Sequence, residues 1–122
     1  MDKRSVPYQF ILNFTVANSI KSFILPGNAD GFYLRARKNN TEIRYLIEGR
    51  QIGGITDDDA GTETPRDPAT ELASDTGVYT TLTKLNNNFD AEGGLENIRF
   101  DNNVTVYVRS SIVDVIEVMI RQ

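Results

Sequence analysis

Residues 6–16, VPYQFILNFTV, decide the fold class of this chain. Every even position from Val6 to Val16 is apolar, whereas the polar residues stand only at odd positions. Successive side chains of a β-strand point to opposite faces of the sheet, so this alternation predicts a strand with one buried face. Eleven residues at about 3.3 Å each would extend about 36 Å, which is long for a strand, and we expect a bend or bulge.

The same alternation recurs in shorter runs along the chain. It is clearest at 104–109, where valine stands at every second position. Residues 112–120 fit the spacing of both a helix and a strand, but six of the nine are Val or Ile, which favour strands. The segments that we predict as strands are 6–16, 20–25, 32–37, 41–47, 78–85, 95–100, 104–109 and 112–120.

Eight strands without a regular alternation of strands and helices predict an all-β protein. Because most of the connections are short turns, we expect an antiparallel β-sandwich, and eight strands favour a single jelly roll. The chain has 122 residues, which is the length of one domain, so residues 1–122 are expected to form one sandwich.

Two neighbouring segments, 32–37 and 41–47, are expected to pair as a hairpin, because Asn39-Asn40 suits a type I′ turn. Arg35, Arg37 and Arg44 would then share the outer face of this hairpin. Such a row fits a phosphate or an acidic partner, and it also fits a solvated sheet face on which a glutamate offsets the charge. A third interpretation places the acidic segment of a neighbouring copy on these arginines.

Residues 48–77 differ from the rest of the chain. They hold five Gly, two Pro, eight acidic and two basic residues, a net charge of −6, which leaves 9 acidic and 11 basic residues elsewhere. A segment of this length and composition predicts an inserted loop or arm that either contacts a neighbour or stays mobile. Within it, Asp67 as N-cap and Pro68 at the first helical position predict one short helix at 67–72.

Composition excludes several classes of function. The chain has no His and no Cys, which excludes Ser-His-Asp and Cys-His catalysis, thiolate zinc sites and disulfides. A formal net charge of −4 argues against a nucleic-acid-binding protein. No apolar run approaches the ~20 residues of a membrane span. We therefore expect neither an enzyme nor a cofactor.

Clustered carboxylates give two weak candidates for a chemical site. Asp57, Asp58 and Asp59 precede a glycine and a glutamate, and such a loop suits Ca²⁺, with Asp57 and Asp59 as the candidate ligands. The spacing differs from that of an EF-hand, and a solvated acidic loop accounts for the same residues. Asp90 and Glu92 could form a carboxylate pair for glycosidic work, but exposed loop residues explain them as well.

A resemblance adds to this interpretation. Residues 104–111, VTVYVRSS, with 115–118, VIEV, resemble the ending of small bacteriophage virion proteins. Residues 30–37, DGFYLRAR, followed by 43–45, IRY, are similar in style. The resemblance implies a small β-sandwich of the decoration, single jelly-roll capsid or penton type. It implies a protein of the virion that contacts itself and other capsid proteins, and it brings no catalytic residues.

Two functions from different classes follow. The first is a structural subunit of a phage particle, which forms a homo-oligomer through Arg35, Arg37, Arg44 and the acidic residues Asp57, Asp58 and Asp59. The alternative is a carbohydrate- or ligand-binding module that depends on Ca²⁺ at Asp57 and Asp59. A small carboxylate-based hydrolase is a third, more remote hypothesis.

Overall fold

The computed structural model describes residues 8–27, 29–47, 67–77, 79–83, 92–96 and 103–121. These residues form eight strands and one short helix. The elements are β1 Tyr8–Phe14, β2 Ile20–Leu25, β3 Gly31–Ala36, β4 Glu42–Ile47, α1 Pro68–Ala73, β5 Thr80–Thr83, β6 Glu92–Glu96, β7 Val104–Ser110 and β8 Asp114–Arg121.

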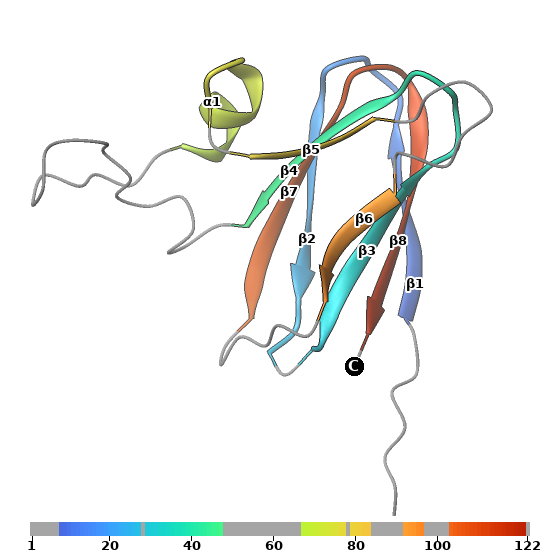
Figure 1. Cartoon of the computed structure of the whole chain (residues 1–122), viewed down its shortest axis with the longest axis vertical. Coiled ribbons are helices and arrows are strands. Elements are labelled where there is room, and N and C mark those ends of the chain that lie inside the picture. The colour runs from blue at the N-terminus through green and yellow to red at the C-terminus, as the bar shows by residue number, and fades with distance from the viewer. Residues whose placement is uncertain are drawn as a thin grey trace, which may run out of the picture.

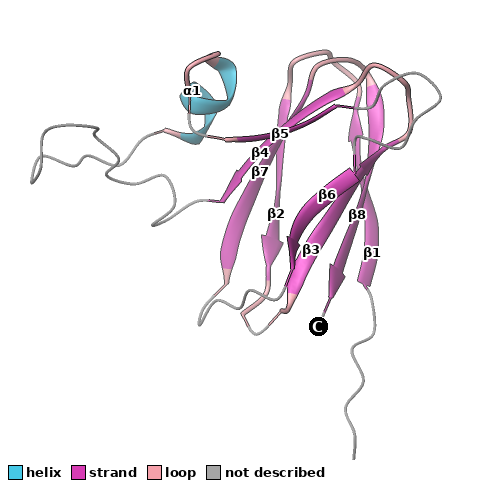
Figure 2. Ribbon diagram, in the orientation of Figure 1, coloured by secondary structure: helices cyan, strands magenta, loops and turns pink. Residues whose placement is uncertain are grey.

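The strands form two four-stranded antiparallel sheets that face each other (Figures 1 and 2). Sheet A has the order β1-β8-β3-β6, and sheet B has the order β2-β7-β4-β5. The chain changes sheet at every connection except that between β4 and β5, so strands from opposite ends of the sequence become neighbours. The predicted all-β, antiparallel sandwich is confirmed.

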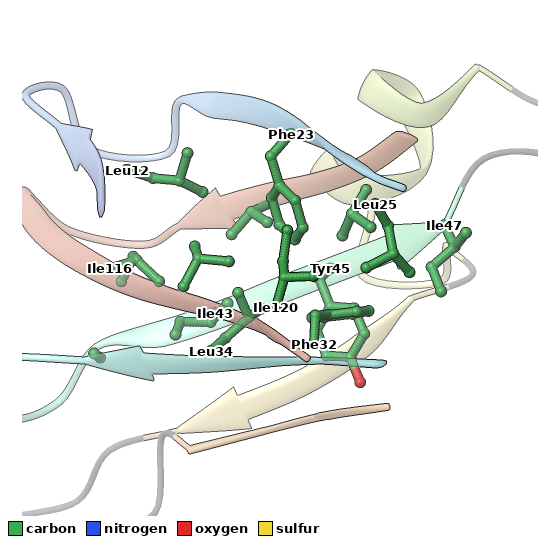
Figure 3. Close-up of a cluster of buried hydrophobic side chains, with 14 of the residues drawn as sticks. Leu12, Phe23, Leu25, Phe32, Leu34, Ile43, Tyr45, Ile47, Ile116 and Ile120 are labelled. Atoms are coloured by element: carbon green, nitrogen blue, oxygen red, sulfur yellow. The ribbon is translucent and has the colours of Figure 1, made fainter. Parts of the chain in front are cut away.

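The described part of the core lies between the sheets and is built mainly from alternate residues of β1, β2, β3, β4, β7 and β8. On β1, Leu12 and Phe14 are buried, as the alternation in 6–16 predicts. Four aromatic rings cross the core in edge-to-face contacts, with centroids 5.3 to 5.6 Å apart. In order these rings are Phe10, Phe23, Phe32 and Tyr45, and Figure 3 shows the last three among the aliphatic side chains.

The predicted hairpin of 32–37 with 41–47 is wrong. The first segment is β3, which pairs with β6 and β8 in sheet A, and the second is β4, which pairs with β5 and β7 in sheet B. Asn40 has the left-handed conformation, with φ of 66°, but its turn leads from one sheet to the other. Both strands have a strongly apolar face, and these two faces meet across the core.

A buried carboxylate holds this crossing in place. Asp114, at the start of β8, is 2% exposed. Its Oδ2 accepts hydrogen bonds from the Thr41 hydroxyl at 2.8 Å and from the backbone N–H of Lys38 at 3.1 Å. The turn after β3 is therefore tied to a strand more than seventy residues away in sequence.

Other boundaries differ in detail from the prediction. β1 ends at Phe14, and the chain then turns with Asn18 at φ of 63°, so Val16 is exposed and not part of the strand. β6 begins at Glu92, three residues before the strand predicted at 95–100, and residues 97–100 lie outside the described ranges. The ambiguous segment 112–120 is confirmed as a strand, β8, because its alternate residues are buried.

The short helix α1 begins where it was predicted, with Asp67 at the N-cap and Pro68 in the first turn. It packs on the outer face of sheet B, where Leu72 and Leu46 are buried. Ile20, Tyr79 and Tyr107 pack around this pair and form a second, smaller apolar cluster. Residues 67–77 of the predicted arm are thus packed against the sandwich, and residues 48–66 lie outside the described ranges.

Candidate functional site

The three arginines predicted to share one face lie on two opposite faces of the sandwich. Arg35 lies near the end of β3 and Arg37 directly follows that strand, both beside the outer face of sheet A, whereas Arg44 lies on the outer face of sheet B. The row predicted for the hairpin does not exist, because β3 and β4 are not paired. Arg44 therefore has a different environment from that of Arg35 and Arg37.

Arg44 is bound by its own chain. Its Nε donates to Glu42 Oε1 at 3.0 Å, and its Nη2 donates to Asp75 Oδ1 at 2.8 Å. Its Nη1 donates to the backbone oxygens of Leu72 at 2.9 Å and Ser74 at 3.5 Å. The guanidinium carbon also lies 4.6 Å from the centre of the Tyr79 ring.

These contacts make Arg44 the attachment point of α1. The side chain is only 11% exposed, and the hydrogen bond to Asp75 raises its pKa above the ordinary value, against the opposing effect of burial. The guanidinium binds the carbonyl oxygens at the end of the helix, where cations are favoured. Arg44 is thus occupied within the chain, and it does not offer a partner the accessible charge that was predicted.

Arg35 and Arg37 are in an open environment. Glu117 of β8 lies between them, with Oε2 2.8 Å from the Nε of Arg37 and Oε1 3.8 Å from the Nε of Arg35. The side chains of the two arginines are 55% and 52% exposed, and that of Glu117 is 39% exposed. These charges remain accessible to a partner.

Beside these charges the outer face of sheet A has a shallow hollow of about 380 Å³. The register places Ile11, Glu117 and Arg35 in one row across three strands, and Gln9, Met119 and Tyr33 in the next. The residues that line the hollow are Gln9, Phe10, Ile11, Tyr33, Arg35, Arg37, Glu117, Val118 and Met119. We refer to this surface, on β1, β8 and β3, as the open face.

The open face combines apolar side chains with two guanidinium groups. Ile11 is 51% exposed, so an apolar side chain is accessible beside the two guanidinium groups. Guanidinium groups bind carboxylates and phosphates through two parallel hydrogen bonds. The surface therefore suits a partner with apolar and acidic groups.

The sequence analysis missed Glu117, Met119 and Ile11 as members of this surface. The alternation in β8 could have placed Glu117 and Met119 on its outward side. No local pattern could have placed them beside Arg35, because the pairing of β8 with β3 joins residues about eighty positions apart.

The predicted acidic sites receive no structural test. Asp57, Asp58, Asp59 and Asp90 lie outside the described residues, so the Ca²⁺ hypothesis stays a prediction. Within the ranges that the structure does describe, no three carboxylates gather in a way that could hold a metal ion. In the same ranges, no helix has the length and apolar character needed to cross a membrane.

Comparisons with known proteins leave the family open. No family model matches the sequence, and no curated protein matches it. Among solved structures, the chain is similar to part of dimeric latent PorU from Porphyromonas gingivalis, with 10% sequence identity and a TM-score of 0.35. That match covers 98% of this chain and 13% of the other, and a likeness this distant carries no argument about function.

Proposed function

We propose that this chain is a structural subunit of a phage particle, which assembles with copies of itself and contacts other capsid proteins. The observation that supports the proposal is the pair of facing four-stranded sheets. Among the described elements, α1 packs on the outer face of sheet B, and none covers the outer face of sheet A (Figure 1). Double-sheet jelly rolls of eight strands are common in viral capsids, and the strand orders of sheets A and B are compatible with that topology.

The charges suggest how the copies meet. Residues 48–66, between β4 and α1, carry five acidic and two basic residues, a net charge of −3. The Asp57, Asp58 and Asp59 run supplies carboxylates of the kind that Arg35 and Arg37 would bind. Because Arg44 already binds Asp75 of its own chain, we assign the acidic run of a neighbour to the exposed Arg35 and Arg37 of the open face.

The mass of the purified chain in solution tests this contact. Light scattering at low and high salt should give a discrete oligomer that weakens as salt screens the charges. Replacing Asp57, Asp58 and Asp59 together by Asn, or Arg35 and Arg37 by Gln, should weaken it in the same way. Lys21→Gln is the matched control, because Lys21 is exposed on β2, on the other sheet. A monomer indifferent to salt would contradict self-assembly.

Membership in a particle needs a separate measurement. Virus particles enriched on a density gradient from the organism that encodes the chain should contain it in stoichiometric amount, as measured by mass spectrometry. Particles that lack the chain would contradict the proposal even if the purified protein forms oligomers.

The alternative is a carbohydrate- or ligand-binding module, and the hollow of about 380 Å³ on the open face is the observation that favours it. Jelly rolls also occur in lectins. In this case Ca²⁺ at Asp57 and Asp59 should raise the melting temperature, since a ligand of the native state stabilises it by mass action. Binding on a glycan array that Asp57→Asn abolishes would favour this function over the first.

A further inference from the structure

The four edge strands of the sandwich differ in how well they are protected against pairing with another chain. Edges expose unpaired N–H and C=O groups, and proteins usually protect them with charges, glycines, prolines or short length. β5 has only four residues, β6 contains two Glu and two Gly, and β2 contains Lys21. β1 has seven residues and none of these features.

Within the part of the chain that the structure describes, β1 is hydrogen-bonded to β8 alone. No described strand lies beside its second edge, which presents the N–H and C=O groups of alternate residues. Ile11, at the centre of this strand, exposes 51% of its surface on the open face. A second strand could pair with β1 along this edge without a change in the described pairing of β1 with β8.

The sequence of β1, YQFILNF, is a chemical palindrome about Ile11. An antiparallel copy centred on Ile11 would place an aromatic residue opposite an aromatic one, Tyr8 and Phe14. It would also place Gln9 opposite Asn13, and Phe10 opposite Leu12, with the two Ile11 residues facing each other. Each amide can donate and accept hydrogen bonds, and no like charges meet, so every pair is compatible.

We propose that β1 pairs antiparallel with β1 of a second copy, about a two-fold axis through Ile11. The two A sheets then form one continuous eight-stranded sheet, and the interface uses the same surface of both copies. The inference rests on the proposed self-assembly and specifies one contact of it. It also brings the two open faces together at the axis, because Ile11 lines the hollow of each copy.

Disulfide cross-linking tests the axis directly, since the natural chain has no cysteine. Facing residues of antiparallel strands have Cα atoms about 4.5–5.5 Å apart, which a disulfide spans. Ile11→Cys should therefore give a covalent dimer on mild oxidation. Val16→Cys is the matched control: Val16 is more exposed, at 63%, but five positions from the axis, so its two copies would be about 30 Å apart.

A mixing experiment tests the register. Gln9 and Asn13 are exposed on β1, so cysteine at either position leaves the core intact. Gln9→Cys chains mixed with Asn13→Cys chains should form a disulfide-linked heterodimer. Neither variant alone should form a disulfide-linked dimer. Equal cross-linking in all three samples, or of Val16→Cys and Ile11→Cys alike, would overturn the proposed pairing.

A charge at the axis separates this inference from the proposed function. Ile11→Lys places two like charges opposite each other and should abolish the dimer, whereas Val16→Lys should leave it unchanged, and circular dichroism should show both variants folded. If Ile11→Lys does not weaken assembly, β1 pairing is wrong and the proposed function still stands.

If the dimer depends on Ile11 but virus particles lack the chain, the pairing is supported and the proposed function is contradicted. A wild-type chain that stays monomeric overturns the pairing.

Discussion

Arginine side chains have contrasting environments on the outer faces of the two sheets. On sheet B, α1 packs over Leu46, and Arg44 is 11% exposed among oxygens of its own chain. On sheet A, Arg35 and Arg37 are half exposed and share Glu117. The guanidinium group of Arg44 is occupied by its own chain, whereas those of Arg35 and Arg37 are accessible to solvent. The comparison teaches that the packing of α1, and not the arginine itself, decides whether the charge is structural or available to a partner.

The largest expected effect is on the apolar contact beneath α1. Leu72 is fully buried against Leu46, so Leu72→Ala should lower the free energy of unfolding by about 2–3 kcal/mol and speed hydrogen exchange in 67–77. On the open face, Ile11→Ala should cost less than about 0.5 kcal/mol. If urea unfolding shows that Leu72→Ala and Ile11→Ala lower the free energy of unfolding equally, the two faces do not differ as the structure indicates.

The arginines themselves give the next largest difference. Arg44→Ala removes hydrogen bonds to two carboxylates and two carbonyl groups, and should cost about 2 kcal/mol. Arg44→Lys should recover only part of this, because an ammonium group cannot reproduce the planar fork. Arg37→Ala, at an exposed ion pair, should cost less than about 0.5 kcal/mol. Chemical denaturation of the three variants checks the order.

Raising the pH above neutral tests the contribution of Tyr45 to stability, on the core side of β4, the strand that also carries Arg44. Tyr45 points into the core, and burial raises its pKa above the ordinary value, partly offset by a hydrogen bond to Thr80. The unfolded state therefore loses this proton first, near pH 10, so stability should fall as pH rises from there through the native pKa. Tyr45→Phe should show a shallower loss over the same range in thermal melts, and an identical slope would refute this role for Tyr45.

The smallest expected effect on stability is at Glu117. Glu117→Gln removes exposed ion pairs and should change the free energy of unfolding by about 0.5 kcal/mol or less, with the difference vanishing at high salt. The same change leaves Arg35 and Arg37 without this carboxylate, so assembly through an acidic partner should strengthen. Glu42→Gln, beside the 11% exposed Arg44, should instead lower stability without strengthening assembly.

The strands and their buried sides could be predicted from the sequence. Alternation is a local property, and it correctly indicated Leu12 and Phe14 as core residues and β8 as a strand. Asp67 and Pro68 predicted the start of α1 for the same reason, because helix capping depends on a few neighbouring residues. The all-β sandwich follows from these local patterns.

The neighbours of each strand depended on the tertiary structure. Asn39-Asn40 was compatible with a hairpin, but the chain passes from sheet A to sheet B at this turn, and the apolar faces of β3 and β4 meet across the core. This choice separated Arg44 from Arg35 and placed Glu117 beside Arg37, eighty residues away. Alternation determines which side of a strand is buried, whereas only the folded chain determines which strand lies next to it, and the open face is a product of that second choice.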